Sequence, residues 1–185
     1  MLVIESCILN SKLLPYAEKL GYNLVFSEDG IAGIKRVTLK GINTNYLKKQ
    51  INRLKSKNVL IFVKPLTLDS LKYAIVNKGV NAIVLDDDNV RIFKKTMLNL
   101  IRINDKFVEI PLKSSINTIY FGITIAYKWA PNIIFSSCAN EFNELWSPIS
   151  KIDYLTVLGA DEEEVYKFVL FNPMKLLYEF NSTNL

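Results

Sequence analysis

The side chains that could carry chemistry in this chain are carboxylates, lysines, hydroxyls and two thiols, because its 185 residues include no histidine. Imidazole is the commonest general base near neutral pH and a frequent metal ligand. Catalytic triads, zinc-binding histidine clusters and histidine-dependent hydrolysis are therefore excluded. Cys7 and Cys138 lie far apart in the sequence and match no paired metal or redox spacing. We interpret both as reduced core thiols.

Acidic residues lie at the end of one expected strand and within another. Asp86, Asp87 and Asp88 come directly after a buried strand, the position where α/β folds place their active sites. Clustered carboxylates offer the hard oxygen ligands that magnesium prefers. Glu109 and Lys113 could point into the same opening at the carboxyl ends of the strands. One hypothesis is thus a metal-dependent phosphoesterase that uses these four acids. The alternative is that one aspartate caps the next helix while the others lie in a solvated turn.

The segment IIFSSCANEFNELWSP, residues 133–148, begins as a short buried strand and ends at a serine-proline pair. The hydroxyl-bearing strand end at Ser136 and Ser137 suits close approach by a phosphate or by another backbone. Trp146 is expected to pack the C-terminal helices over one end of the domain, because a large aromatic side chain contributes most through burial.

Charge is distributed unevenly along the chain. The formal charge is +8 over residues 1–85 and −3 over residues 86–185. No acidic residue occurs between Asp29 and Asp69, and that interval holds nine lysines and arginines. Such a polarised, lysine-rich surface predicts a polyanionic partner.

The cations of this interval define the predicted RNA-binding residues, which are Lys35, Arg36, Lys48, Lys49, Arg53, Lys55 and Lys57. A helix over residues 45–56 turns Leu47, Ile51 and Leu54 inward and its lysines outward. A merely solvated face is the alternative, although such faces usually intersperse acids that form i,i+4 pairs. The exposed face also lacks large apolar residues that would enter a membrane, which favours nucleic acid. Few aromatics accompany the lysines, so contact with the RNA backbone is favoured over base stacking.

The elements that position these residues alternate along the chain. Strands are expected at 2–6, 22–26, 37–42, 58–63, 81–86, 107–112 and 132–137. Helices are expected at 11–20, 45–56, 67–78, 92–103 and 116–129. The strands at 58, 81 and 132 are almost wholly apolar, which is typical of parallel strands covered on both faces, in a barrel or an open sheet.

The C-terminal quarter is expected to be helical. Pro148 at the first helical position after Ser147 starts one helix, Asp161 with Glu164 forms a capping box for a second, and Asn172-Pro173 starts a third. We expect one domain over residues 1–185, with no signal peptide and no membrane span, and a cytoplasmic location.

The run APNIIFSSCANEFNELWSPISKIDYLTVLGADEEEVYKFVLFNPMKLL resembles the C-terminal signature of protein component 3 of archaeal ribonuclease P, the p30-type family. The shared features are a strand ending in small residues, Ser147-Pro148, Gly159, the acidic run 161–164 and a proline-opened helix at 173–177. The segment FVEIPLKS, with Glu109 and Lys113, is similar to a strand of that family.

The resemblance implies an irregular, TIM-like (β/α) barrel of about seven mainly parallel strands with extra C-terminal helices, akin to PHP phosphoesterases. It also implies a ribonuclease P subunit that helps to remove the 5′ leader of precursor tRNA, with chemistry in the RNA. The implied partners are the ribonuclease P RNA, a Pop5-like protein component 2 and other ribonuclease P proteins, with precursor tRNA met indirectly. This chain would bind no cofactor or metal itself and hold no catalytic residue, and magnesium would serve the RNA. A stand-alone metal-dependent PHP-like phosphoesterase and a protein scaffold remain the alternatives.

Overall fold

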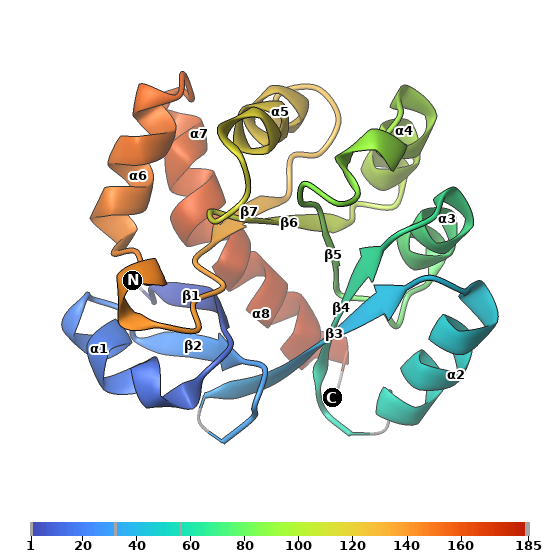
Figure 1. Ribbon diagram of the computed structural model, residues 1–185, viewed down its shortest axis with the longest axis horizontal. Helices are drawn as coiled ribbons and strands as arrows, with labels where there is room; N and C mark the ends of the chain where they lie inside the picture. Colours follow the sequence, from blue (N-terminus) through green and yellow to red (C-terminus); the bar gives the residue numbers. More distant parts are fainter. Residues whose placement is uncertain (1, 32, 56, 184–185) are drawn as a thin grey trace.

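The computed structural model describes residues 2–31, 33–55 and 57–183. Its seven strands are β1 (Ile4–Ile8), β2 (Leu24–Ser27), β3 (Ile34–Gly41), β4 (Leu60–Pro65), β5 (Ala82–Val84), β6 (Phe107–Pro111) and β7 (Ile133–Ser136). Each strand pairs in parallel with the next, in the order β1 to β7. Leu9 N donates to the carbonyl of Ala139 at 2.8 Å, and Ile8 forms a parallel bridge with Ala139. The sheet is therefore a nearly closed barrel, as the family resemblance implies (Figure 1).

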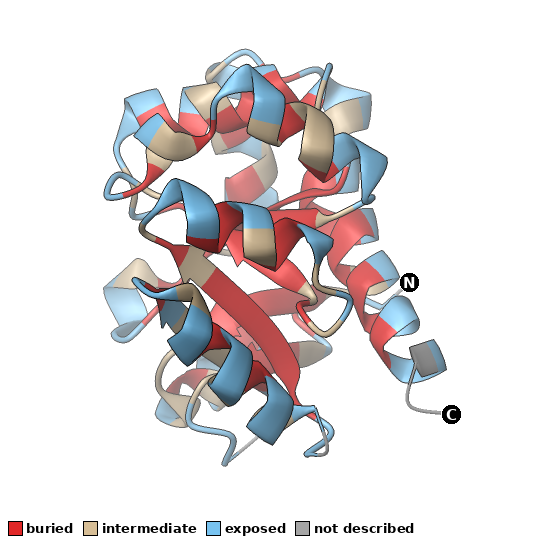
Figure 2. Ribbon diagram, turned by 90° about the vertical axis from the view of Figure 1, so that its right-hand side faces the viewer, coloured by how far each residue is buried: buried red, intermediate tan, exposed pale blue. Residues whose placement is uncertain are grey.

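Helices surround this barrel. They are α1 (Leu14–Lys19), α2 (Thr44–Leu54), α3 (Leu68–Val76), α4 (Lys95–Ile103), α5 (Ile116–Ala126), α6 (Pro148–Val157), α7 (Glu162–Tyr166) and α8 (Asn172–Thr183). Figure 2 shows buried strands inside and helices that are exposed on their outer faces. The larger core lies between strands and helices, where Leu47 and Ile51 of α2 join Ile61 and Val63 of β4.

The barrel has two different ends. Helix α8 lies across the amino-terminal ends of the strands, where its Leu176 and Phe180 pack with Ile4, Leu60 and Phe107. This packing closes one end with apolar side chains. The carboxyl ends of the strands form the other end, the barrel mouth, and the loops that follow the strands carry polar residues there.

Several predicted helix ends are wrong. Asn10, not Ser11, accepts from the backbone at the start of a 3₁₀ turn, Ser11–Leu13, that precedes α1. Helix α2 begins at Thr44, because the side chain of Asn43 accepts from Asn45 N at 2.8 Å, and it ends at Leu54. The predicted last residue of that helix, Ser56, lies outside the described residues.

The C-terminal helices differ from the prediction more clearly. Asp161 makes no side-chain capping bond, so the predicted capping box with Glu164 is wrong, and the first turn of α7 is acidic without one. Helix α8 begins at Asn172, as predicted, but no loop separates it from α7. A π-helical turn, Lys167–Phe171, joins α7 directly to α8. A wider turn relieves the contact between a proline ring and the preceding turn, so the helix continues through Pro173.

Candidate functional site

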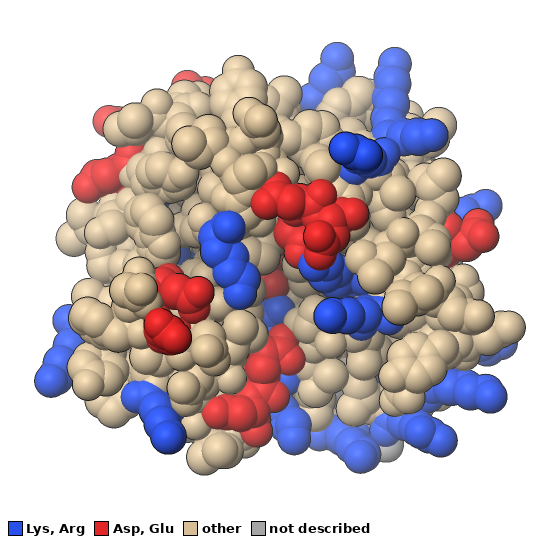
Figure 3. Space-filling model, viewed as in Figure 1, with Lys and Arg blue, Asp and Glu red and all other residues tan. Residues whose placement is uncertain are grey.

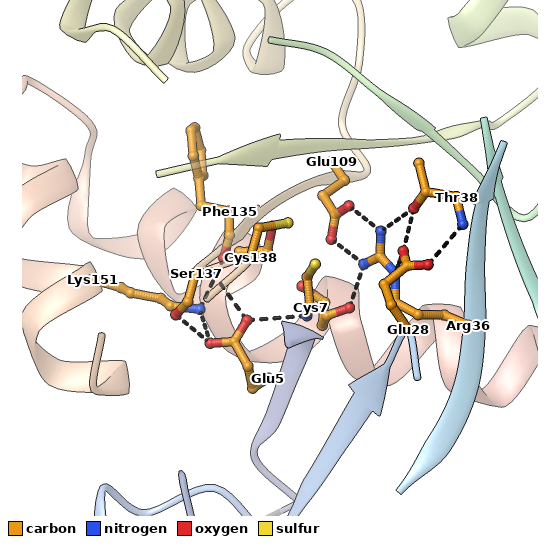
Figure 4. A network of polar contacts seen from close by, with 12 residues as sticks. Glu5, Cys7, Glu28, Arg36, Thr38, Glu109, Phe135, Ser137, Cys138 and Lys151 are labelled. Carbon is orange, nitrogen blue, oxygen red and sulfur yellow. Dashed lines mark hydrogen bonds and ion pairs between the residues drawn. The ribbon is translucent and has the colours of Figure 1, made fainter. Parts of the chain in front are cut away.

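A buried ion pair spans the barrel mouth. The guanidinium of Arg36, on β3, donates to both carboxylate oxygens of Glu109, on β6, at 2.7 Å each. It also donates through Nε to Glu28 at 3.0 Å and lies over the ring of Phe62, 3.6 Å from its centroid. Figure 4 shows Arg36 between Glu28 and Glu109. Arg36 of β3 thus contacts β4 through Phe62, β6 through Glu109 and the turn after β2 through Glu28.

The prediction that Arg36 belongs to the basic surface is wrong, because its side chain is only 1% exposed. Side chains alternate along a strand, so Arg36 shares a face with Thr38 and Lys40, which turn toward the mouth, while Lys35 lies on the other face. Burial alone would lower the pKa of Arg36, but neighbours that include Cys7 and Glu109 outweigh it and raise the pKa well above its ordinary value. The guanidinium stays charged inside the barrel.

A second buried network lies across the seam between β1 and β7. Lys151 of α6 donates to Glu5 of β1 at 2.7 Å, and its side chain is 2% exposed. Ser137 donates to the same carboxylate through its hydroxyl, at 2.6 Å, and through its backbone N, at 3.0 Å. The small strand end that the sequence singles out therefore receives a carboxylate from the first strand. Figure 4 shows Glu5, Ser137 and Lys151 together.

Trp146 packs where the sequence predicts. Its ring lies 5.0 Å from that of Tyr154 on α6, and its backbone N donates to Ser137 Oγ at 3.2 Å. Its backbone carbonyl accepts from the hydroxyl of Tyr22 at 2.8 Å. Trp146 thus joins α6 to the end of β7.

The three consecutive aspartates are engaged by neighbouring side chains. Asp86 and Asp88 form ion pairs with Lys64, the latter at 2.6 Å. Asp87 accepts from the hydroxyls of Ser115 and Thr118 at 2.6 Å each, and these bonds lower its pKa. Asp87 therefore binds the start of α5. The capping alternative is wrong as stated, because the next helix, α4, has no side-chain capping bond and the other two aspartates pair with Lys64.

The carboxylate set of the phosphoesterase hypothesis is not brought together. Within the described residues, one group of three or more cysteine and acidic ligand atoms lies close enough to share an ion, and it consists of Cys7, Glu109 and Cys138. Arg36 occupies both oxygens of that glutamate, and burial raises the pKa of Cys7 well above its ordinary value. A positive guanidinium beside the group opposes binding of a second cation.

A cavity of about 490 Å³ opens at the mouth, and both Glu109 and Lys113 border it, as predicted. Lys113 also donates to the carbonyl of Cys138 at 3.2 Å. Figure 3 shows acidic and basic side chains side by side around the centre of this face. The mouth is therefore a mixed-charge surface and not a continuous basic one.

The remaining predicted cations form the basic face, which we define as Lys35, Lys48, Lys49, Arg53, Lys55 and Lys57. All six residues are exposed. Among the residues that the structure describes, none of the six side chains forms an ion pair with a carboxylate. Figure 3 shows lysine and arginine side chains along the lower right, over α2. These charges are available to an external partner.

The geometry of α2 explains how the basic face forms. Leu47 and Ile51 are fully buried against the barrel, which turns Lys48, Lys49 and Arg53 to solvent. Lys35 lies at the start of β3. The next residue, Arg36, pairs with Leu60 at the start of β4, so Lys35 lies at the same end of the sheet as Lys57, which precedes β4.

The turn after β2 positions Glu28 against Arg36 and depends on Asp29. Burial raises the pKa of Asp29, but hydrogen bonds from Ser27, Ser11 and Ile31 outweigh it and bring the pKa to about 2. A carboxylate with a depressed pKa stabilises the fold above its unfolded pKa, and this contribution is lost as pH falls through the folded pKa.

We therefore expect Asp29→Asn to lower the free energy of unfolding at neutral pH, and the deficit relative to wild type to disappear as pH approaches about 2. Urea unfolding of both proteins across this range checks the prediction. Asp153→Asn, at an exposed position on α6, is the matched control. A deficit that does not change with pH would contradict the assignment.

Comparison with known proteins gives a structural likeness without a sequence match. No family model matches the chain, and no curated protein matches it. No helix within the described residues is long and apolar enough to cross a membrane. One chain of a solved structure, the cryo-EM structure of archaeal ribonuclease P with mature tRNA, superposes with a TM-score of 0.74 at 12% sequence identity. The alignment covers 97% of this chain and 89% of the other, so the two chains share one fold over nearly their whole lengths.

Proposed function

We propose that this chain is an RNA-binding protein subunit of ribonuclease P, which binds RNA through the basic face and leaves the chemistry to the RNA. The observation that carries the proposal is the basic face itself: six exposed cations around α2 without a carboxylate partner among the described residues. The fold shared with a chain of archaeal ribonuclease P supports the same proposal.

Phosphate neutralisation explains why lysines suit this role. Each lysine or arginine that contacts a phosphate releases condensed counterions, which makes binding strong and dependent on salt but independent of sequence. Screening closely packed phosphates reduces the magnesium that the RNA needs to hold its active fold. A Pop5-like protein would be the protein partner, and precursor tRNA would be met through the assembled complex.

Direct binding tests the proposal. The purified chain, alone and with the Pop5-like protein, is titrated onto ribonuclease P RNA and onto a hairpin RNA of equal length. We expect saturable binding to the ribonuclease P RNA that weakens steeply with salt. Binding that is absent at low salt, or that does not weaken as salt is raised, would contradict the proposal.

The chain assayed alone provides a second prediction. With magnesium or manganese present, we expect no turnover of a generic phosphodiester or of precursor tRNA, because Arg36 occupies Glu109 and Lys64 pairs with Asp86 and Asp88. Metal-dependent turnover that Glu109→Gln abolishes would favour the phosphoesterase alternative instead.

A further inference from the structure

The two cysteines of the chain lie side by side at the barrel seam. Cys7 is on β1, and Cys138 comes two residues after the end of β7. Ile8 and Ala139, the residues that follow them, are partners in the parallel bridge that closes the barrel. The two cysteines therefore occupy neighbouring positions across the seam, and Figure 4 shows both thiols there.

The separation of the two thiols suits a disulfide. Their sulfur atoms lie within 4.8 Å of each other. Neighbouring strands in a sheet lie roughly 4.8 Å apart, and disulfides join Cα atoms separated by about 4.4–6.8 Å. We expect rotation of the two side chains to bring the sulfurs from this separation to a bond of about 2.05 Å.

Both thiols are buried, yet they can be reached from solvent. Each of them borders the cavity of about 490 Å³ that opens at the barrel mouth. Burial raises the pKa of the Cys7 thiol, while the charge of Arg36 opposes this effect. The thiolate is the attacking species, so the reaction is expected to be slow at neutral pH and faster in alkaline solution.

We propose that Cys7 and Cys138 are an oxidisable dithiol whose disulfide closes the barrel seam covalently. A thiolate of one cysteine attacks a small-molecule disulfide, forms a mixed disulfide and releases one thiol. The second cysteine then displaces the other thiol and forms the intramolecular bond. The two cysteines lose two electrons and two protons, and the small-molecule disulfide gains both. The site is independent of RNA binding through the basic face.

The disulfide would change the stability of the barrel more than its structure. Few backbone contacts join β1 to the segment after β7, and the new bond would close a loop that includes most of the chain. A disulfide constrains the unfolded chain most when it closes a long loop. We expect the midpoint of thermal unfolding to rise by about 5–10 °C on oxidation, and to return on addition of a reductant.

The experiment equilibrates the purified full-length chain in mildly alkaline buffers of oxidised and reduced glutathione at several ratios. Iodoacetamide under denaturing conditions then counts the free thiols by intact mass. We expect the reduced protein to take up two alkyl groups and the oxidised monomer to take up none. The oxidised monomer should also weigh two hydrogens less than the reduced chain before alkylation. Peptide mapping should recover Cys7 linked to Cys138.

Cys7→Ser and Cys138→Ser are the control variants, and each should keep one thiol that can be alkylated after reduction. Wild-type monomer that keeps two free thiols in the most oxidising buffer overturns the proposal. Oxidised wild type that runs only as a disulfide-linked dimer, or carries only adducts of the small molecule, overturns it too.

Discussion

The variant Lys49→Ala/Arg53→Ala is expected to bind ribonuclease P RNA with a shallower salt dependence than the wild type. Each lost phosphate contact removes roughly 0.7–0.9 from the slope of log K against log salt, so the pair should lose about 1.5. Lys49 and Arg53 lie one helical turn apart on the solvent face of α2, where one RNA backbone could contact both. Filter binding between about 50 and 200 mM salt measures the slope.

The matched control removes the same charge elsewhere. Lys12→Ala/Lys94→Ala changes two exposed lysines outside the basic face and should leave the slope within error of wild type. Equal losses of slope in both variants would mean that net charge, and not the basic face, governs binding. An unchanged slope in Lys49→Ala/Arg53→Ala would remove α2 from the proposed interface.

Arg36→Met is expected to destabilise the barrel severely. Removing the guanidinium leaves Glu109, which is 0% exposed, charged and without its bidentate partner. Breaking a buried ion pair from one side typically costs about 3–5 kcal/mol, because the remaining charge stays desolvated. Denaturant unfolding, followed by circular dichroism, should show a loss of free energy of this size.

Two further variants separate pairing from packing. Arg36→Met/Glu109→Leu removes both charges and should recover much of the loss, since replacing a whole buried pair with apolar residues is often close to neutral. Lys35→Ala, one residue away but exposed, should change the free energy of unfolding by less than about 0.5 kcal/mol. A loss below about 1 kcal/mol in Arg36→Met would contradict the structural role of this pair.

The alternation of apolar strands and amphipathic helices was sufficient to predict all seven strands and the helices around them. The apolar runs at β4, β5 and β7 indicate parallel strands covered on both faces. These patterns did not distinguish a barrel from an open sheet. Closure depends on contacts between β1 and the segment after β7, which lie far apart in the sequence.

The C-terminal helices show where local signals fail. Pro173 correctly predicts a helix start at this point, but it does not predict the π-helical turn that joins α7 to α8 without a break. Asn172 is held at this point because its side chain donates to the carbonyl of Ile133 at 2.7 Å. A tertiary contact of this kind produces no periodic pattern in the sequence, so it cannot be predicted from one.

The site predictions that failed did so for local and for long-range reasons. Grouping Arg36 with its basic neighbours overlooked the period of two along a strand, which places it opposite Lys35. The position of Glu109 within an apolar strand was a signal for a buried ion pair, because a buried acid requires a cationic partner. No sequence signal pairs Cys7 with Cys138, since only the closure of the barrel brings them together.

The central claim is that the chain stabilises RNA by neutralising its phosphates. Its most direct test is a magnesium titration of precursor tRNA cleavage. Ribonuclease P RNA is assembled with the Pop5-like protein and either wild-type chain, Lys49→Ala/Arg53→Ala, or no chain. The account predicts that the wild-type chain lowers the magnesium concentration for half-maximal cleavage. With the double variant, this concentration should return most of the way to its value without the chain. An unchanged magnesium requirement with wild-type chain bound would contradict it.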